Sequence, residues 1–163
     1  QIISDGSNWY NLSKDKYRTA YVKDVKALDT AGGTFTSGAW QTRDLNDLSG
    51  DTEFISLSSN QFTLEAGKYE ISWSAPALSV NGHATRLRNT TDSSNQDFGS
   101  SSYSSTSDTT ISNSLGEASF EITTTKTFEI QHRGQVTKAT NGFGVQMSQQ
   151  VETYSQVKIT KVN

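Results

Sequence analysis

The side chains that could do acid–base or metal chemistry are few and scattered. The two histidines, His83 and His132, stand far apart in the sequence, and there is no cysteine. Neither a G-x-S-x-G nor an H-E-x-x-H motif occurs, so a nucleophile elbow and a zinc-binding helix have no support. The lack of cysteine also excludes disulfides and thiolate metal ligands. We therefore predict a protein that is not an enzyme, with no catalytic residues, no bound metal and no cofactor.

The 17 acidic residues leave two alternatives open. A glycosidase needs only two carboxylates at a suitable distance, although nearly all of them here lie on predicted polar strand faces or in loops. One loop carries four acids that could hold a hard cation through oxygen ligands: Asp44, Asp47, Asp51 and Glu53. Because their spacing is not that of an EF-hand loop, a solvated acidic loop is the preferred interpretation.

The charge distribution argues against two classes of partner. The 163 residues carry a net charge of −3, from 14 basic and 17 acidic side chains, and neither sign runs in blocks. Nucleic-acid binding usually needs a clustered basic surface, so it is not expected. No apolar run approaches the roughly 18 residues of a membrane span, so membrane insertion is not expected either. The lack of cysteine fits folding in a reducing cytoplasm.

The clearest local pattern lies in residues 62–77. Four apolar residues alternate with polar ones there, namely Tyr69, Ile71, Trp73 and Ala75. This period of two predicts a central strand with one buried and one polar face. We expect Gly67 to supply the turn before it, and Pro76 to end it because proline cannot donate to a ladder.

Similar patterns predict further short strands along the chain. They cover residues 19–28, 40–46, 54–57, 61–64, 83–89, 116–122, 128–133, 143–147 and 151–162, with a helix as the competitor only at 19–28. Asn81-Gly82 predicts a hairpin, and the polar stretch 90–114 predicts exposed loops around one or two edge strands. His132 falls on an apolar face, so we expect a core or interface histidine. Eight to ten strands without a helix predict an antiparallel β-sandwich or jelly roll.

The core of such a domain would be thin. Apolar side chains make up only 32% of the residues, less than a typical globular domain contains. A two-layer sandwich needs little apolar mass, and contacts between subunits can bury more of it. We therefore expect a two-layer sandwich and, in addition, contacts between subunits that bury apolar side chains.

Several segments, in order, resemble the C-terminal domain of bacteriophage tail fibres. They are A-G-G-T-F-T-S-G-A-W-Q-T-R-D-L-N at 31–46, S-L-S-S-N-Q-F-T-L-E-A-G-K-Y at 56–69, S-A-P-A at 74–77, R-L-R-N-T-T-D-S-S at 86–94, F-E-I-Q-H-R at 128–133 and A-T-N-G-F-G-V at 139–145. The resemblance implies a jelly roll similar to tumour-necrosis-factor and complement globular-head domains, which assemble as trimers. A pattern similar to that of complement heads is also present, with one residue fewer between its first two members: Phe62, Gly67, Tyr69, Ile71 and Trp73.

The resemblance also implies an organisation and a function. Residues 1–18 would link to a fibre shaft or preceding module, and 19–163 would form a homotrimeric head at the fibre tip of a virion assembled in the host cytoplasm. The head would bind a bacterial surface glycan or outer-membrane receptor, with avidity from three sites. Exposed loops are expected to supply the contacts, from Asn81, His83, Tyr103 and Asn141. Four aromatic residues are expected in the core or the trimer interface: Tyr69, Trp73, Phe120 and Tyr154.

Two other functions remain open at this point. The same jelly roll could serve assembly, as a structural or decoration protein of a virion. It could also be a carbohydrate-binding module of a polysaccharide depolymerase.

Overall fold

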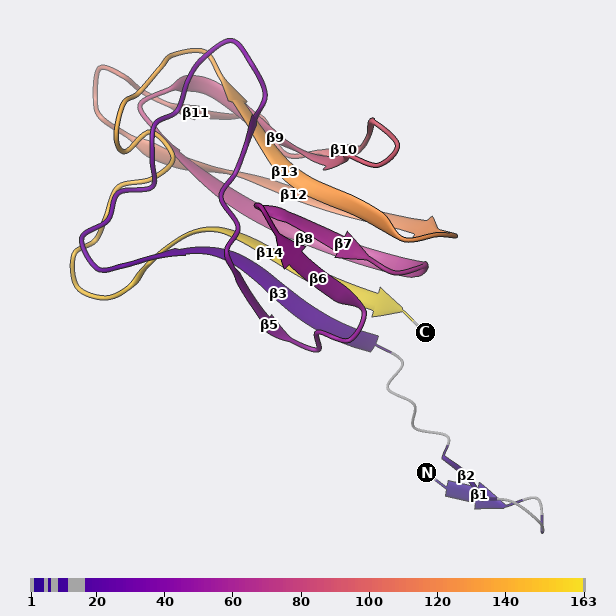
Figure 1. Cartoon of the computed structure of the whole chain (residues 1–163). Helices are drawn as coiled ribbons and strands as arrows, with labels where there is room; N and C mark the ends of the chain where they lie inside the picture. The colour runs from indigo at the N-terminus through magenta and orange to yellow at the C-terminus, as the bar shows by residue number, and fades with distance from the viewer. Residues whose placement is uncertain (1, 5, 7–8, 12–16, 163) are drawn as a thin grey trace.

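The structure is a computed structural model that describes residues 2–4, 6, 9–11 and 17–162. Its body is a sandwich of two antiparallel β-sheets (Figure 1). The first sheet has five strands, in the order β12 (Ile111–Ile122), β8 (Gly67–Leu78), β14 (Glu152–Val162), β3 (Tyr17–Lys26) and β5 (Asp47–Gly50). Within the described residues there is no helix, and so none that could cross a membrane. The all-β class is therefore confirmed.

The second sheet has seven strands. Five of them follow the order β10 (Ser94–Phe98), β9 (Asn81–Asn89), β13 (Lys126–Gly134), β7 (Gln61–Leu64) and β6 (Ile55–Ser58), while β11 (Ser102–Ser104) pairs with β9 and β4 (Gln41–Thr42) with β13. A separate two-stranded sheet joins β1 (Ile2–Ser4) to β2 (Trp9–Asn11). Much of the expected linker 1–18 lies outside the described residues, so its boundary with the head stays a prediction.

The core lies between the two sheets. Alternate residues of each strand point inward, as the period-two pattern predicted. Phe62 and Phe128 stack with ring centroids 5.8 Å apart, and Phe54 packs against Tyr69 at 6.0 Å. One connected cluster contains most of the buried apolar side chains, including Val22, Leu64, Ile71, Leu87, Ile130 and Ile159.

Strand β8 is an inner strand of the five-stranded sheet, as expected, but Pro76 does not end it. The strand continues to Leu78, and beyond Ser74 it pairs only with β12. The Pro76 carbonyl accepts a hydrogen bond from Arg43, and the nitrogen of the same residue points to the same side of the strand. The missing N–H therefore interrupts no ladder bond, which is the condition under which proline is tolerated in a strand.

The predicted hairpin at Asn81-Gly82 is also wrong. The chain turns at Ser79 and Val80, and both Asn81 and Gly82 lie in β9. Strands β8 and β9 belong to different sheets, so the segment is a crossover. The chain crosses again between β7 and β8 and between β12 and β13, and this alternation between sheets builds the jelly roll.

Three other segments differ from the expectation in extent. Only Gln41–Thr42 of the predicted strand 40–46 pairs with a neighbour, and residues 143–147 form no strand. In the polar stretch 90–114, β10 and β11 form the expected short strands, and β12 already begins at Ile111. The strand at 19–28 is confirmed as β3, and no helix competes there.

Candidate functional site

The four residues expected to bind a receptor lie at one end of the sandwich. Figure 1 shows this end, with β11 and the loops that follow β3, β11 and β13, opposite the end where β3 begins and β14 finishes. Strand β11 pairs with the start of β9, which places Tyr103 opposite Gly82 and Ser104 opposite Asn81. The Leu78 N–H bonds the Gly142 carbonyl at 2.9 Å, which brings the Asn141 loop to the end of β8. Of the four, Tyr103 is the most accessible, with 63% of its surface exposed.

The side chain of His83, by contrast, points into the protein. Its Nδ1 lies 2.9 Å from Nε2 of His132, and its Nε2 lies 2.8 Å from the Ser112 hydroxyl. Ser112 donates to the Tyr103 carbonyl, so it accepts from His83 Nε2–H, and His83 Nδ1 accepts from His132 Nε2–H. His132 is completely buried, which confirms the expected core histidine. Burial lowers the pKa of His83 to about 4 and depresses the pKa of His132 strongly.

Arg43 is a buried residue that the sequence pattern did not reveal. Its guanidinium donates to the Ser155 hydroxyl at 2.7 Å, the Pro76 carbonyl at 3.1 Å and the Phe143 carbonyl at 2.9 Å. It also stacks over the Phe143 ring, 4.1 Å from the centroid. Burial lowers the pKa of Arg43 to about 10, and the charge of Asp24 opposes this effect. Arg43 thus ties the loop after β13 to β8 and β14.

A depression on the outer face of the seven-stranded sheet reaches this same end. We call it the Trp40 depression, and its lining includes Ser37, Trp40, His83, Ala84, Ser101, Arg133 and Gln135. The register places Ala84 opposite Arg133 and Arg86 opposite Gln131 on the outer face. The Arg86 guanidinium lies 4.3 Å from the centroid of the Trp40 ring. The centroid of the exposed Phe98 ring lies 6.2 Å from the Trp40 centroid. The outer face therefore presents aromatic rings beside arginines.

The arginines on this face have no carboxylate partner in the part of the chain that the structure describes. Arg86, Arg88 and Arg133 form no ion pair there. Burial and the neighbouring charge of Arg88 lower the pKa of Arg86, with a further contribution from Arg133, while Glu129 opposes the shift. The Glu129 carboxylate is itself occupied by the side-chain amides of Gln61 and Gln131.

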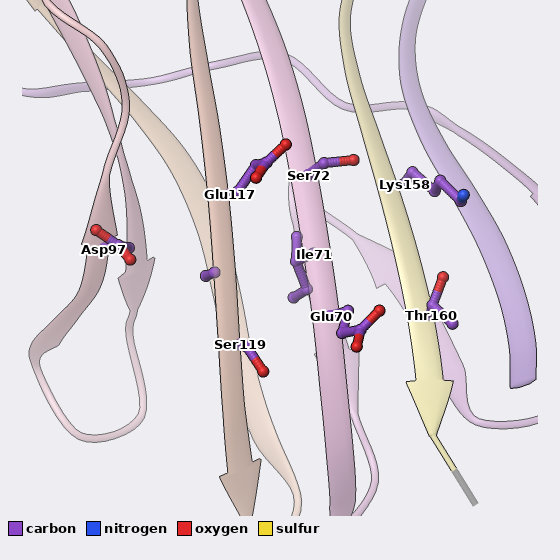
Figure 2. Close-up of a pocket in the computed structure, with 9 residues that line it drawn as sticks. Glu70, Ile71, Ser72, Asp97, Glu117, Ser119, Lys158 and Thr160 are labelled. Atoms are coloured by element: carbon purple, nitrogen blue, oxygen red, sulfur yellow. The ribbon is translucent and has the colours of Figure 1, made fainter.

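The outer face of the five-stranded sheet has a different character. The pairing aligns rows of residues across its strands, such as Tyr21, Lys158, Ser72 and Glu117. Figure 2 shows Glu70, Ser72, Glu117, Lys158 and Thr160 projecting from one side of this sheet. Two shallow pockets meet at Ser72, Glu117 and Lys158. The middle of this face therefore has two small side chains of β8, Ser72 and Ser74, with exposed Tyr21 and Leu115 beside them.

The four expected core or interface aromatics point into the chain's own interior. Tyr69, Trp73 and Tyr154 are buried, and Phe120 packs against the core with its ring 5.3 Å from that of Phe128. The hydroxyls of Tyr69 and Tyr154 donate to the carbonyls of Glu65 and Thr30, and Trp73 Nε1 donates to Thr85 Oγ1 at 2.8 Å.

The acidic loop is largely neutralised by the chain's own cations. Asp51 forms two bonds of 2.7 Å with Arg18, whose guanidinium also contacts Glu53 at 2.8 Å. Asp44 pairs with Lys26 at 2.6 Å. No cluster of three or more potential metal ligands occurs among the described residues, so the cation-site alternative gains no support.

Solved structures share this fold at low sequence identity. The globular domain of zebrafish complement 1qA protein superposes with a TM-score of 0.56 and 14% identity, over 87% of this chain and 94% of that chain. Murine APRIL at pH 5.0 superposes with a TM-score of 0.55 and 6% identity, over 90% of this chain and 100% of that chain. The likenesses confirm the jelly-roll fold. No protein-family model and no curated protein matches the sequence, so the resemblance to tail-fibre domains stays a prediction.

Proposed function

We propose that this chain is the non-enzymatic, receptor-binding head of a bacteriophage tail fibre. The observation that carries the proposal is the gathering of loops and the exposed Tyr103 at the end of the sandwich away from both the start of β3 and the end of β14. A head joined to a fibre shaft through the segment before β3 would present this end to the host. The tail-fibre-like segments of the sequence add the virion context.

A homotrimer is part of this proposal. The outer face of the five-stranded sheet has the small side chains of Ser72 and Ser74 on β8 beside the exposed Tyr21 and Leu115. Small side chains allow a neighbouring subunit to approach closely, and the apolar groups gain from burial. Three copies joined through this face would hold three receptor-binding ends side by side, so weak single contacts would add up through avidity.

Adsorption to bacteria tests the receptor-binding function. The fluorescently labelled protein is incubated with a panel of strains that differ in surface polysaccharide and outer-membrane proteins. We expect saturable binding to a subset of strains, weakened at least about tenfold by Tyr103→Ala. Glu53→Ala, at an exposed position near the other end, is the matched control. Absence of saturable binding to every strain, or equal binding by Tyr103→Ala, would contradict the proposal.

The two other functions make different predictions in the same system. A virion structural or decoration protein would bind virus particles and no bacterial strain. A carbohydrate-binding module of a depolymerase would bind isolated polysaccharide, and a longer chain that contains it would shorten that polysaccharide. Of these two functions, the Trp40 depression favours the carbohydrate-binding module over the virion structural or decoration protein.

A further inference from the structure

The Trp40 depression combines groups that proteins use to bind sugars. The Trp40 ring provides an apolar wall, and Arg86 holds that ring by stacking 4.3 Å from its centroid. Ser101 is exposed at the rim. The ring can pack against the C–H groups of a sugar, while hydroxyl and guanidinium groups bond its oxygens. The Arg86 side chain is in turn positioned by its Nε bond to Gln131, at 2.7 Å.

The electrostatics of the same face favour a negatively charged ligand. Arg86, Arg88 and Arg133 lie on one face of β9 and β13, and no carboxylate pairs with them among the described residues. Glu129, which lies opposite Arg88 across the strands, is buried and bonded to two amides. An anion placed beside Arg133 would relieve the repulsion among the guanidinium groups and could form bidentate bonds with an exposed guanidinium.

We propose that the Trp40 depression binds a saccharide that carries an anionic group, a carboxylate or a phosphate. Arg133 would bind the anion, and Trp40 would stack on the sugar ring. This inference rests on the proposed receptor-binding function and specifies the chemistry of the receptor. The chain carries a net charge of −3, so attraction of an anion to this face depends on the local arginines. Arg133 lines the depression and Arg86 stacks on its Trp40 wall. This small, local positive charge fits a short charged saccharide better than a nucleic-acid backbone, which needs an extended basic track.

Binding of defined oligosaccharides to the intact protein tests the inference. Calorimetry or surface plasmon resonance compares trigalacturonate with its methyl ester, and a phosphorylated mannose trisaccharide with its dephosphorylated form. We expect at least one charged sugar to bind about tenfold or more tightly than its neutral counterpart, because charge-assisted hydrogen bonds are lost in the neutral one. The preference should shrink as salt is raised. The two pairs distinguish a carboxylate from a phosphate as the recognised group.

Variants locate the site. Arg133→Gln should remove most of the preference for charged sugar, and Trp40→Ala should weaken charged and neutral sugars alike. Lys126→Gln removes one positive charge from the same strand as Arg133 but at its other end, where Lys126 pairs with Asp92, and should leave both affinities unchanged. Equal binding of charged and neutral sugars, or an unchanged preference in Arg133→Gln, would overturn the inference.

Adsorption separates this inference from the proposed function. If the protein adsorbs to bacteria but Arg133→Gln adsorbs equally and no charged sugar is preferred, the inference is wrong and the receptor-binding function stands. If the charged sugars bind as expected but no strain is adsorbed, the inference stands and the receptor-binding function is wrong.

Discussion

At the scale of single residues, the buried histidine pair makes stability depend on pH. His83 and His132 are neutral in the fold, and their rings share one hydrogen bond. Protonating His83 would either set two N–H groups against each other or move the His132 proton to Nδ1, which is buried and has no hydrogen-bond partner among the described residues. The folded pKa of His83 is about 4, below its ordinary value of about 6.5. Its contribution is therefore fully present above pH 6.5 and is lost as the pH falls towards 4, because the unfolded chain takes up the proton first.

We expect the free energy of unfolding to fall between pH 6.5 and 5, with a loss from His83 on the order of 3 kcal/mol by pH 4. Urea unfolding at a series of pH values measures the slope. Burial raises the pKa of Asp24, so its contribution to the free energy of unfolding changes with pH in the opposite direction. The pH dependence of the unmodified protein is therefore compared with that of the double variant His83→Gln, His132→Gln, which keeps Asp24 and lacks the histidines. A slope that is the same in the double variant would show that the histidines are not its source.

Arg43 also has a testable structural role. Its guanidinium satisfies a hydroxyl and two carbonyl groups, of Ser155, Pro76 and Phe143. Arg43→Met would leave these buried acceptors without a donor, which costs about 1–3 kcal/mol for each such group. We expect Arg43→Met to lower the free energy of unfolding by about 3 kcal/mol or more in urea titrations. Arg43→Lys should lose less, since it keeps one donor; a change below about 0.5 kcal/mol in Arg43→Met would contradict this role.

At the scale of elements, β8 and β12 fit together at one position. Gly116 lies opposite Trp73, and a Cβ at Gly116 would come within 2.0 Å of Trp73 Cζ2. Gly116→Ala should therefore displace the indole and its bond to Thr85, with a loss of about 2 kcal/mol or more in the free energy of unfolding. Ser56→Ala, at an exposed position on β6 of the other sheet, should stay within about 0.5 kcal/mol. Equal stability of the two variants in thermal or urea unfolding would refute this packing.

The sequence predicted the half-buried strands well and their partners poorly. Apolar and polar residues alternate along β8, β9, β12 and β13 because one face of each strand is buried and the other is exposed to solvent. This pattern is a local property of the sequence. Which sheet a strand joins is not local, so Asn81-Gly82 was interpreted as a hairpin although the chain crosses between sheets there. Arg43 sits in a polar stretch that resembles a surface, and only the folded structure shows the carbonyls that accept its hydrogen bonds.

The candidate binding face shows the same limit. Arg86 and Arg88 are two residues apart in the predicted strand 83–89, so alternation puts both on one face, and this part of the site could be predicted. Trp40 and Arg133 come from distant segments, and no spacing in the sequence indicates that they line one depression. Among the residues predicted to bind a receptor, Tyr103 is exposed and His83 is buried, because alternation along β9 turns His83 inward.

At the scale of the whole molecule, the decisive question is whether the five-stranded sheet joins three copies. Each chain has a mass of 17.8 kDa, and we expect a sedimentation mass of three times that value. Ser72 lies at the centre of the outer face, where both shallow pockets meet. Ser72→Arg would place a long charged side chain between the subunits without entering the chain's own core, so we expect it to yield folded monomers.

The matched control places the same change on the opposite sheet. Ser56 is exposed on β6 of the seven-stranded sheet, so Ser56→Arg should remain trimeric. Circular dichroism and urea unfolding check that both variants are folded. A monomeric mass for the unmodified protein would refute the trimer, whereas a trimeric mass for Ser72→Arg would show that another surface joins the subunits. Monomers should also adsorb more weakly to bacteria than trimers do, because avidity is lost while each receptor-binding end stays intact.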